Sequence, residues 1–151
     1  VYENFERDIY ETLVQAKDAL AKYQTIQLVF PESSYYPKGI VKGFENFCRD
    51  YAFDFKVSKQ AQPEKGTAYI TVMEDDLISI LDQIKEQGLQ LGKNVGLISY
   101  NETPIKRLLF DGISTISTDF VKMGELAADL VKSNARTKIE NPFSYIPRSS
   151  L

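Results

Sequence analysis

The order in which strand-like and helix-like stretches follow one another is the feature of this sequence that most constrains its fold. Runs rich in β-branched and aromatic residues predict strands, and stretches with apolar residues three or four positions apart predict helices. The predicted strands cover residues 26–30, 53–57, 68–72, 95–100 and 113–116. The predicted helices cover residues 7–23, 40–51, 77–87 and 123–131, with a short helix or loop at 105–110. This alternation predicts an α/β fold in three layers, a mostly parallel sheet with helices on both faces.

The connection between the second and third predicted strands, residues 58–67, is short for such a sheet. A parallel crossover usually needs a dozen or more residues and a helix, and this polar segment has no helical pattern. Either a minimal crossover without a helix exists here, or the strand at 53–57 pairs differently. Its alternation of aromatic and charged residues places that strand near an edge of the sheet. Residues 141–151 are expected to form an irregular tail on the surface.

Composition limits the chemistry that this chain can perform. With 151 residues, 43% of them hydrophobic, it has the size and apolar content of one globular domain. It has no histidine and one cysteine, which removes imidazole-based triads, the commonest metal ligand and any internal disulfide. The glycines form no phosphate-binding motif, and Cys48 on an apolar helix face is expected to be a packed thiol. We therefore expect no cofactor, no metal, no catalytic residues and no enzyme activity.

Charge and hydropathy limit the partners. The chain has 18 basic and 21 acidic residues and a formal charge of -3, so we expect contact with DNA only through a domain absent from this chain. No apolar run approaches the roughly 18 to 20 residues of a membrane span, and the polar start lacks the features of a secretory signal. These features predict no membrane contact and a cytoplasmic location. Because the chain starts with Val1 rather than methionine, we expect it to be a fragment or a processed product.

The candidate ligand site lies where the predicted strands end. In open parallel sheets, ligands bind beyond the carboxyl ends of the strands. The residues that follow the strands are polar and aromatic: Ser33, Ser34, Tyr35, Tyr36, Glu74, Asn101 and Glu102. Hydroxyls, amides and carboxylates beside aromatic faces suit a polyhydroxylated ligand such as a sugar, because each ligand hydroxyl both donates and accepts a hydrogen bond.

A structural explanation exists for the same residue types. Acids at the start of a helix often cap it, and Asp75, Asp76 and Asp119 occupy such positions. Tyr35 and Tyr36 would then only cover a loop. The pair Glu74 and Glu102 is weak evidence for acid–base catalysis, since two acids near a cleft are common in an acidic protein.

The carboxyl-terminal two thirds of the chain resembles the carboxyl-terminal subdomain of the LacI/GalR-type sensor, which has the type I periplasmic-binding-protein fold. The similarity spans residues 68–127 without gaps and includes the segments 68–88, 94–102 and 113–116. Met123-Gly124 at the start of the last predicted helix and the ending Arg148-Ser149-Ser150 match the family pattern, and Gly43-Phe44 matches it more weakly.

Several positions depart from the family pattern. Asn101 stands at the position of the effector-binding Asp, and Glu74 at that of the Asp that closes the preceding strand. Ile40 stands where many members have an Arg that binds the ligand, and Lys38 or Tyr36 would take its place. Such divergence resembles sensors fused to a GntR-type winged helix as much as those fused to the LacI headpiece.

The resemblance implies that residues 1–151 are one effector-binding subdomain of a bacterial transcription regulator, without its partner subdomain and its DNA-binding domain. It implies a carbohydrate effector that changes operator affinity, and a homodimer whose contact includes Leu108, Leu109 and Phe110. Burial of these three residues inside the monomer is the alternative. Two other functions remain open at this point: the solute-binding receptor of a sugar transporter, and a receiver-like or flavodoxin-like module.

Overall fold

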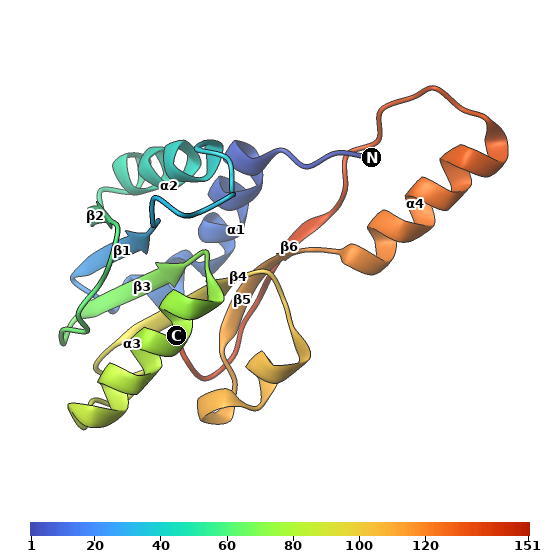
Figure 1. Cartoon of the computed structure of the whole chain (residues 1–151). Helices are drawn as coiled ribbons and strands as arrows, with labels where there is room; N and C mark the ends of the chain where they lie inside the picture. Colours follow the sequence, from blue (N-terminus) through green and yellow to red (C-terminus); the bar gives the residue numbers. More distant parts are fainter.

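The computed structural model describes residues 1–151 and contains one six-stranded sheet with the strand order β2-β1-β3-β4-β5-β6 (Figure 1). The strands are β1 (Thr25–Val29), β2 (Asp54–Ser58), β3 (Thr67–Thr71), β4 (Gly96–Tyr100), β5 (Ser114–Thr118) and β6 (Phe143–Ile146). The helices are α1 (Phe5–Leu20), α2 (Gly39–Asp50), α3 (Glu74–Glu86) and α4 (Phe120–Ser133), with short 3-10 helices η1 (Pro104–Arg107) and η2 (Leu109–Asp111). The first five strands are parallel, which confirms the predicted α/β class.

The two faces of the sheet are covered by different helices because strand side chains alternate between the faces. Ile26 and Leu28 point to the face covered by α1 and α2, and are fully buried there. Val29 and Tyr69 belong to the opposite face, which packs against α3 (Figure 1). Cys48 of α2 lies inside the first of these cores, where burial raises the pKa of its thiol to about 12. The expectation of a packed thiol is confirmed.

Gly43 lets α1 and α2 approach each other closely. A β-carbon built at Gly43 would lie 2.1 Å from the backbone oxygen of Glu6 and 2.6 Å from the side chain of Ile9. No larger residue fits there without moving a helix. Gly124 of α4 presents the opposite case, because a β-carbon there would meet no atom within 4 Å.

Strand β2 is an edge strand that pairs with β1, and the link from β2 to β3 passes β1 without forming a helix. The register places Thr25 beside both Asp54 and Thr67, so β1 lies between the two strands that the link joins. The side chain of Gln27 donates to Ser58 Oγ at 2.6 Å, and Tyr69 Oη donates to the carbonyl of Gln62 at 2.9 Å. Of the two alternatives for residues 58–67, the minimal crossover is confirmed.

The expectation of an irregular carboxyl-terminal tail is wrong for part of that segment. Residues 143–146 form β6, which pairs antiparallel with β5 in the register Thr115 to Ile146 and Thr118 to Phe143. The following residues are held as well, since Ser150 Oγ accepts from the Ser114 amide and donates to the Leu97 carbonyl, at 2.7 Å each. Tertiary pairing with β5 therefore orders a segment that is too short for a clear sequence signal.

Helix α4 covers neither face of the sheet. Asp119 caps its start by accepting from the Lys122 amide at 2.8 Å, and Asn134 ends it in the left-handed conformation with φ 52°. None of its residues is buried, and Val121 and Val131 are 75% and 81% exposed. Figure 1 shows the helix projecting away from the sheet. The predicted apolar side of residues 123–131 is thus not buried within this chain.

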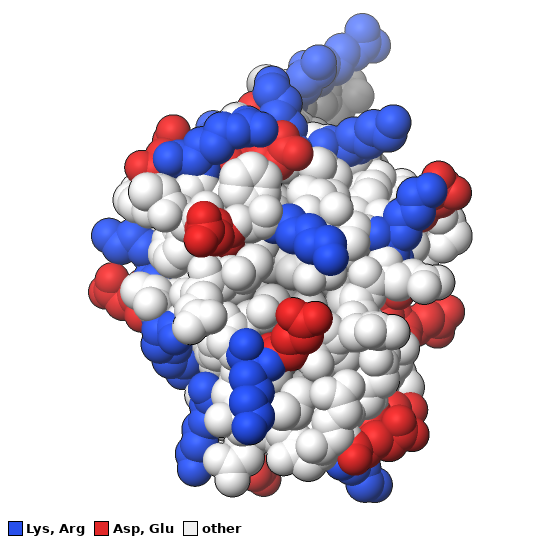
Figure 2. Space-filling view, turned by 90° about the vertical axis from the view of Figure 1, so that its left-hand side faces the viewer, with Lys and Arg blue, Asp and Glu red and all other residues white.

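Charges of both signs are dispersed over the surface seen in Figure 2, with no continuous basic area on that face. Ion pairs such as Lys42 with Glu6 at 3.0 Å and Arg49 with Glu45 at 3.0 Å fit this mixture. None of the helices combines the length and the hydropathy that a membrane span requires.

Candidate functional site

A pocket of about 350 Å³ lies at the carboxyl ends of β1, β3 and β4. Its walls come from the loop after β1, the first turn of α3, the end of β4 with η1, and the start of α4. The lining residues are Tyr35, Tyr36, Val72, Met73, Glu74, Asp75, Tyr100, Asn101, Thr103, Lys106 and Phe120. The position agrees with the expectation that ligands bind beyond the carboxyl ends of parallel strands.

Aromatic rings form one wall of this pocket. The ring of Tyr36 lies 4.7 Å from that of Tyr35 and 5.0 Å from that of Tyr100, measured between centroids. Tyr35 is 76% exposed at the mouth, whereas Tyr100 is buried. Burial raises the pKa of the Tyr36 hydroxyl, so it remains a neutral O–H donor at physiological pH. The wall offers both a ring face for stacking and a hydroxyl for a hydrogen bond.

Asn101 joins the aromatic wall to the end of β4. Its side-chain Nδ2 donates to the Tyr36 hydroxyl at 2.8 Å, and its buried Oδ1 has no hydrogen-bond partner within the chain. Its backbone is left-handed, with φ 61°, and its amide donates to the Ile116 carbonyl at 2.7 Å. Buried acceptors without partners are uncommon and costly in proteins, so Oδ1 is a candidate acceptor for a ligand hydroxyl.

A buried lysine lies beneath the polar side of the pocket. Lys106 is 1% exposed, and its Nζ donates to the Tyr100 carbonyl at 3.1 Å and to the Asn101 carbonyl at 2.7 Å. Glu74 Oε1 lies 3.8 Å from this nitrogen and accepts from Thr103 Oγ1 at 3.4 Å. Burial lowers the pKa of Lys106, while the charges of Glu74 and Glu102 act in the opposite direction.

The structure brings four of the eight predicted ligand residues to this pocket: Tyr35, Tyr36, Glu74 and Asn101. The other four do not line it. Ser33 is exposed, Ser34 accepts locally from the Tyr36 amide at 3.2 Å, and Lys38 is exposed at the start of α2. The ligand roles of the four residues in the pocket stay predictions.

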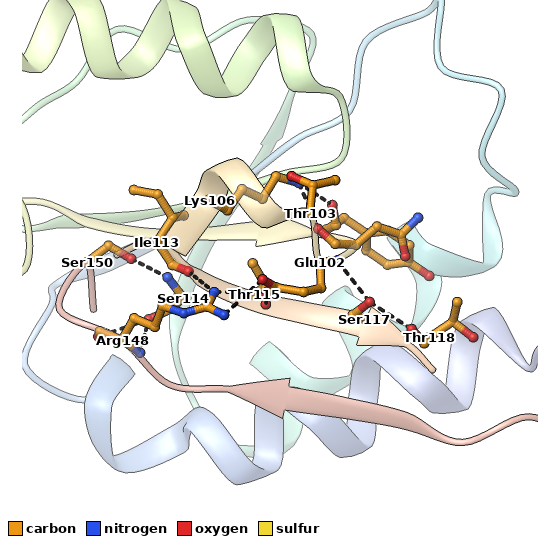
Figure 3. A network of polar contacts seen from close by, with 12 residues as sticks. Glu102, Thr103, Lys106, Ile113, Ser114, Thr115, Ser117, Thr118, Arg148 and Ser150 are labelled. Atoms are coloured by element: carbon orange, nitrogen blue, oxygen red, sulfur yellow. Dashed lines mark hydrogen bonds and ion pairs between the residues drawn. The ribbon is translucent and has the colours of Figure 1, made fainter. Parts of the chain in front are cut away.

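Glu102, the eighth predicted residue, faces the carboxyl-terminal tail instead of the pocket (Figure 3). Its two carboxylate oxygens accept from Nη1 and Nη2 of Arg148, at 2.9 Å each, and from Thr115 Oγ1. The left-handed turn at Asn101 separates the directions of these neighbouring side chains. The geometry gives Glu102 a structural role.

The capping explanation holds for one of the three acids proposed for it. Asp119 caps α4, but α3 has Met73 at its cap position and no side-chain cap bond, so Asp75 and Asp76 lie inside its first turn. Asp75 lines the pocket, where its carboxylate is exposed. The sequence analysis did not predict that Thr103, Lys106 and Phe120 line the pocket. For Lys106 the reason is that no residue pattern marks a lysine whose partners are backbone carbonyls.

A larger cavity of about 650 Å³ lies elsewhere, between α3 and the link that follows β2. Polar side chains such as Gln27, Gln60 and Gln83 line it, and it has no aromatic wall. The smaller pocket is the candidate ligand site, because aromatic faces, an unpartnered acceptor and strand ends come together there.

The apolar residues expected at a dimer contact lie at the surface on η1 and η2. Leu108 is 77% exposed, Phe110 40% and the neighbouring Ile105 52%. Leu109 is half-buried and packs against the core beneath α3. Burial inside the monomer therefore accounts for Leu109 but not for Leu108.

Comparison with known proteins identifies this architecture. Residues 19–151 match the family model of the periplasmic binding protein-like domain. The chain belongs to this family. The solved structures that are similar to this chain have the same fold. A sugar-binding transcriptional regulator of the LacI family from Escherichia coli, complexed with phosphate, matches with TM-score 0.77 and 13% identity over 100% of this chain and 62% of its own.

Two further structures show the same fold. The lac repressor dimer bound to operator and an anti-inducer matches with TM-score 0.74 and 18% identity, over 98% of this chain and 51% of its own. A LacI family transcriptional regulator from Enterococcus faecium with bound ribose matches with TM-score 0.72 and 16% identity, over 98% of this chain and 63% of its own. This periplasmic binding protein-like domain thus spans between half and two thirds of those chains.

Proposed function

We propose that this chain is the effector-sensing part of a LacI-type transcription regulator and binds a carbohydrate-like effector in the pocket of Tyr36 and Asn101. The observation that carries the proposal is the Asn101 side chain, whose Nδ2 is bound to Tyr36 while its buried Oδ1 lacks a partner. Beside it stand the Tyr36 hydroxyl, a carboxylate at Glu74 and an exposed ring at Tyr35. Such a set offers donors, acceptors and a stacking face to one polyhydroxylated molecule.

The proposed mechanism is ligand-dependent closure. The effector contacts this subdomain and a second one encoded outside residues 1–151, and it favours the closed form only through its higher affinity for that form. Closure moves the attached DNA-binding domains relative to each other in a homodimer that uses the exposed residues around Leu108. The similar proteins are transcription regulators, which supports a cytoplasmic, non-enzymatic role for this chain.

Ligand titration tests the proposal. We expect a neutral monosaccharide from a panel that includes ribose to shift the backbone amide NMR signals of residues around Tyr36, Glu74 and Asn101 in this chain. Because a single subdomain supplies only part of the site, binding to residues 1–151 is expected near millimolar, and tighter to the full-length protein.

Asn101→Ala is expected to weaken binding about tenfold, the effect of losing a hydrogen bond of about 1.4 kcal/mol. Gln62→Ala, at an exposed position in the β2–β3 link, serves as the control and should bind as the wild type does. The proposal fails if the full-length protein binds no carbohydrate in the panel, or if both variants bind equally well.

A further inference from the structure

Two of the three N–H groups of the buried Lys106 ammonium are bonded to the chain itself. An ammonium carries three N–H donors, and two of them are used by the carbonyls of Tyr100 and Asn101. Glu74 Oε1 is the carboxylate oxygen within 4 Å of Nζ, at 3.8 Å, which is too long for a hydrogen bond, and the Lys106 side chain is 2% exposed. A cation buried without such partners would be strongly disfavoured. Two backbone carbonyls and one carboxylate of the chain therefore stabilise the charge, and the third N–H has no hydrogen-bond partner within the chain.

The same bonds fix the shape of the pocket wall. Lys106 holds the carbonyl of Asn101, whose left-handed backbone, φ 61°, directs its amide side chain to Tyr36. The backbone of Lys106 is anchored in turn, because its carbonyl accepts from the Ile113 amide at 2.8 Å. The lysine thus connects the end of β4, the η1 turn and the start of β5 (Figure 3).

The exposed charged groups of the pocket are negative. The Glu74 side chain is 61% exposed, Asp75 is exposed beside it, and no other lysine or arginine lines the pocket. Lys106 also lines the pocket, but it is buried beneath these carboxylates and offsets part of their charge. An anionic ligand would approach two carboxylates, whereas the one cation of the pocket, Lys106, is 1% exposed and has two of its three N–H groups bonded to carbonyls.

From this arrangement we infer that Lys106 is a positioning residue of the effector site, not an anion receptor, and that the effector is an uncharged polyhydroxylated molecule. This inference rests on the proposed function and selects among the ligands that the fold can bind. In this site a sugar phosphate should be rejected, although one similar regulator was solved with phosphate.

Binding of matched neutral and phosphorylated probes tests the inference. We expect the full-length protein to bind the better of ribose and glucose at least tenfold more tightly than the corresponding 5- or 6-phosphate. Lys106→Met, which keeps most of the aliphatic stem, should weaken neutral-sugar binding at least tenfold, and Lys93→Met, at an exposed lysine, should not. Glu74→Gln should reduce the discrimination against the phosphate.

The opposite pattern would overturn the inference. If the wild type prefers the phosphate and Lys106→Met removes only that preference, Lys106 is an anion receptor. If the wild type binds neither probe nor any other carbohydrate, the proposed function fails, and the positioning role is then tested without a ligand.

Two readouts need no ligand. In Lys106→Met the amides of Asn101 and Glu102 should exchange with deuterium at least tenfold faster than in Lys93→Met, because their turn loses its anchor. In the wild type, NMR should detect a slowly exchanging Lys106 ammonium coupled to two backbone carbonyls, even if the variant does not fold. Unchanged exchange in a folded variant, or an ammonium without these couplings, would refute the positioning role.

Discussion

Arg148 and Glu102 form two parallel hydrogen bonds, with Nη1 2.9 Å from Oε2 and Nη2 2.9 Å from Oε1. Arg148 Nη1 also donates to the Ile113 carbonyl at 2.7 Å, so a single side chain joins the tail to the segments on both sides of η1 and η2. The two side chains are 17% and 25% exposed, which places the pair largely out of water. Bidentate pairs of this kind are the stronger class of charged hydrogen bond.

Glu102→Gln is expected to lower the free energy of unfolding by about 2–3 kcal/mol, because it leaves a mostly buried guanidinium without its charged partner. Glu125→Gln is the matched control, since Glu125 pairs with Lys122 on the exposed side of α4. That change should cost less than about 0.5 kcal/mol. Urea unfolding followed by circular dichroism measures both, and equal effects would contradict the structural role of Glu102.

The same pair predicts how stability depends on pH. Burial alone would raise the pKa of Glu102, but the hydrogen bonds from Arg148 and Thr115 and the charge of Arg148 outweigh it, so the pKa lies below its usual 4.5. A carboxyl with a depressed folded-state pKa contributes stability above its unfolded-state pKa and loses it as pH falls through the folded-state value. The stability difference between wild type and Glu102→Gln should therefore be constant near neutral pH and shrink below about pH 4.5. A difference that grows on acidification would show the reverse shift.

Substitution by alanine is expected to change the free energy of unfolding in opposite directions at two glycines that lie in helices. Gly43→Ala places a methyl group 2.1 Å from the Glu6 oxygen and should cost about 2–3 kcal/mol as α1 and α2 move apart. Gly124→Ala meets no atom within 4 Å and should stabilise by about 0.5–1 kcal/mol through helix propensity. Thermal unfolding compares them, and a tolerated Gly43→Ala would mean that α1 and α2 are not this close.

Neighbouring leucines should separate assembly from folding. Leu108→Asp alters a side chain that is 77% exposed, so it should convert the proposed dimer to a monomer without loss of stability. Leu109→Asp alters a half-buried side chain packed against the core beneath α3, and should cost about 2 kcal/mol or more. Analytical ultracentrifugation and urea unfolding of both variants test this. A Leu108→Asp variant that keeps the dimer mass would remove η1 and η2 from the interface.

The parallel sheet could be predicted because largely apolar runs mark the strands at 26–30, 68–72 and 95–100, and stretches with helical spacing lie between most of the strands. The meeting of Tyr36, Glu74 and Asn101 followed from it, since parallel strands end at one edge. β6 was missed although Phe143 and Tyr145 alternate with Ser144, because four residues between two prolines give a weak signal. The direction of Glu102 and the burial of Lys106 depend on a left-handed backbone and on distant carbonyls, which local sequence does not encode.

The placement of β6 and the tail bears on how the chain folds during synthesis. Ser150 bonds both Leu97 and Ser114, and Gly92 lies against the backbone of Ser149, so β4 and β5 are bridged by residues made after them. These contacts join residues that are far apart in sequence, and contacts of this kind form late in folding. While this segment is still inside the ribosome, β1 to β3 and their helices would already be folded. β5 would then be an edge strand without a pairing partner on one side. Chaperone binding or aggregation at that stage is expected to act on the unpaired β5 rather than on the amino-terminal half.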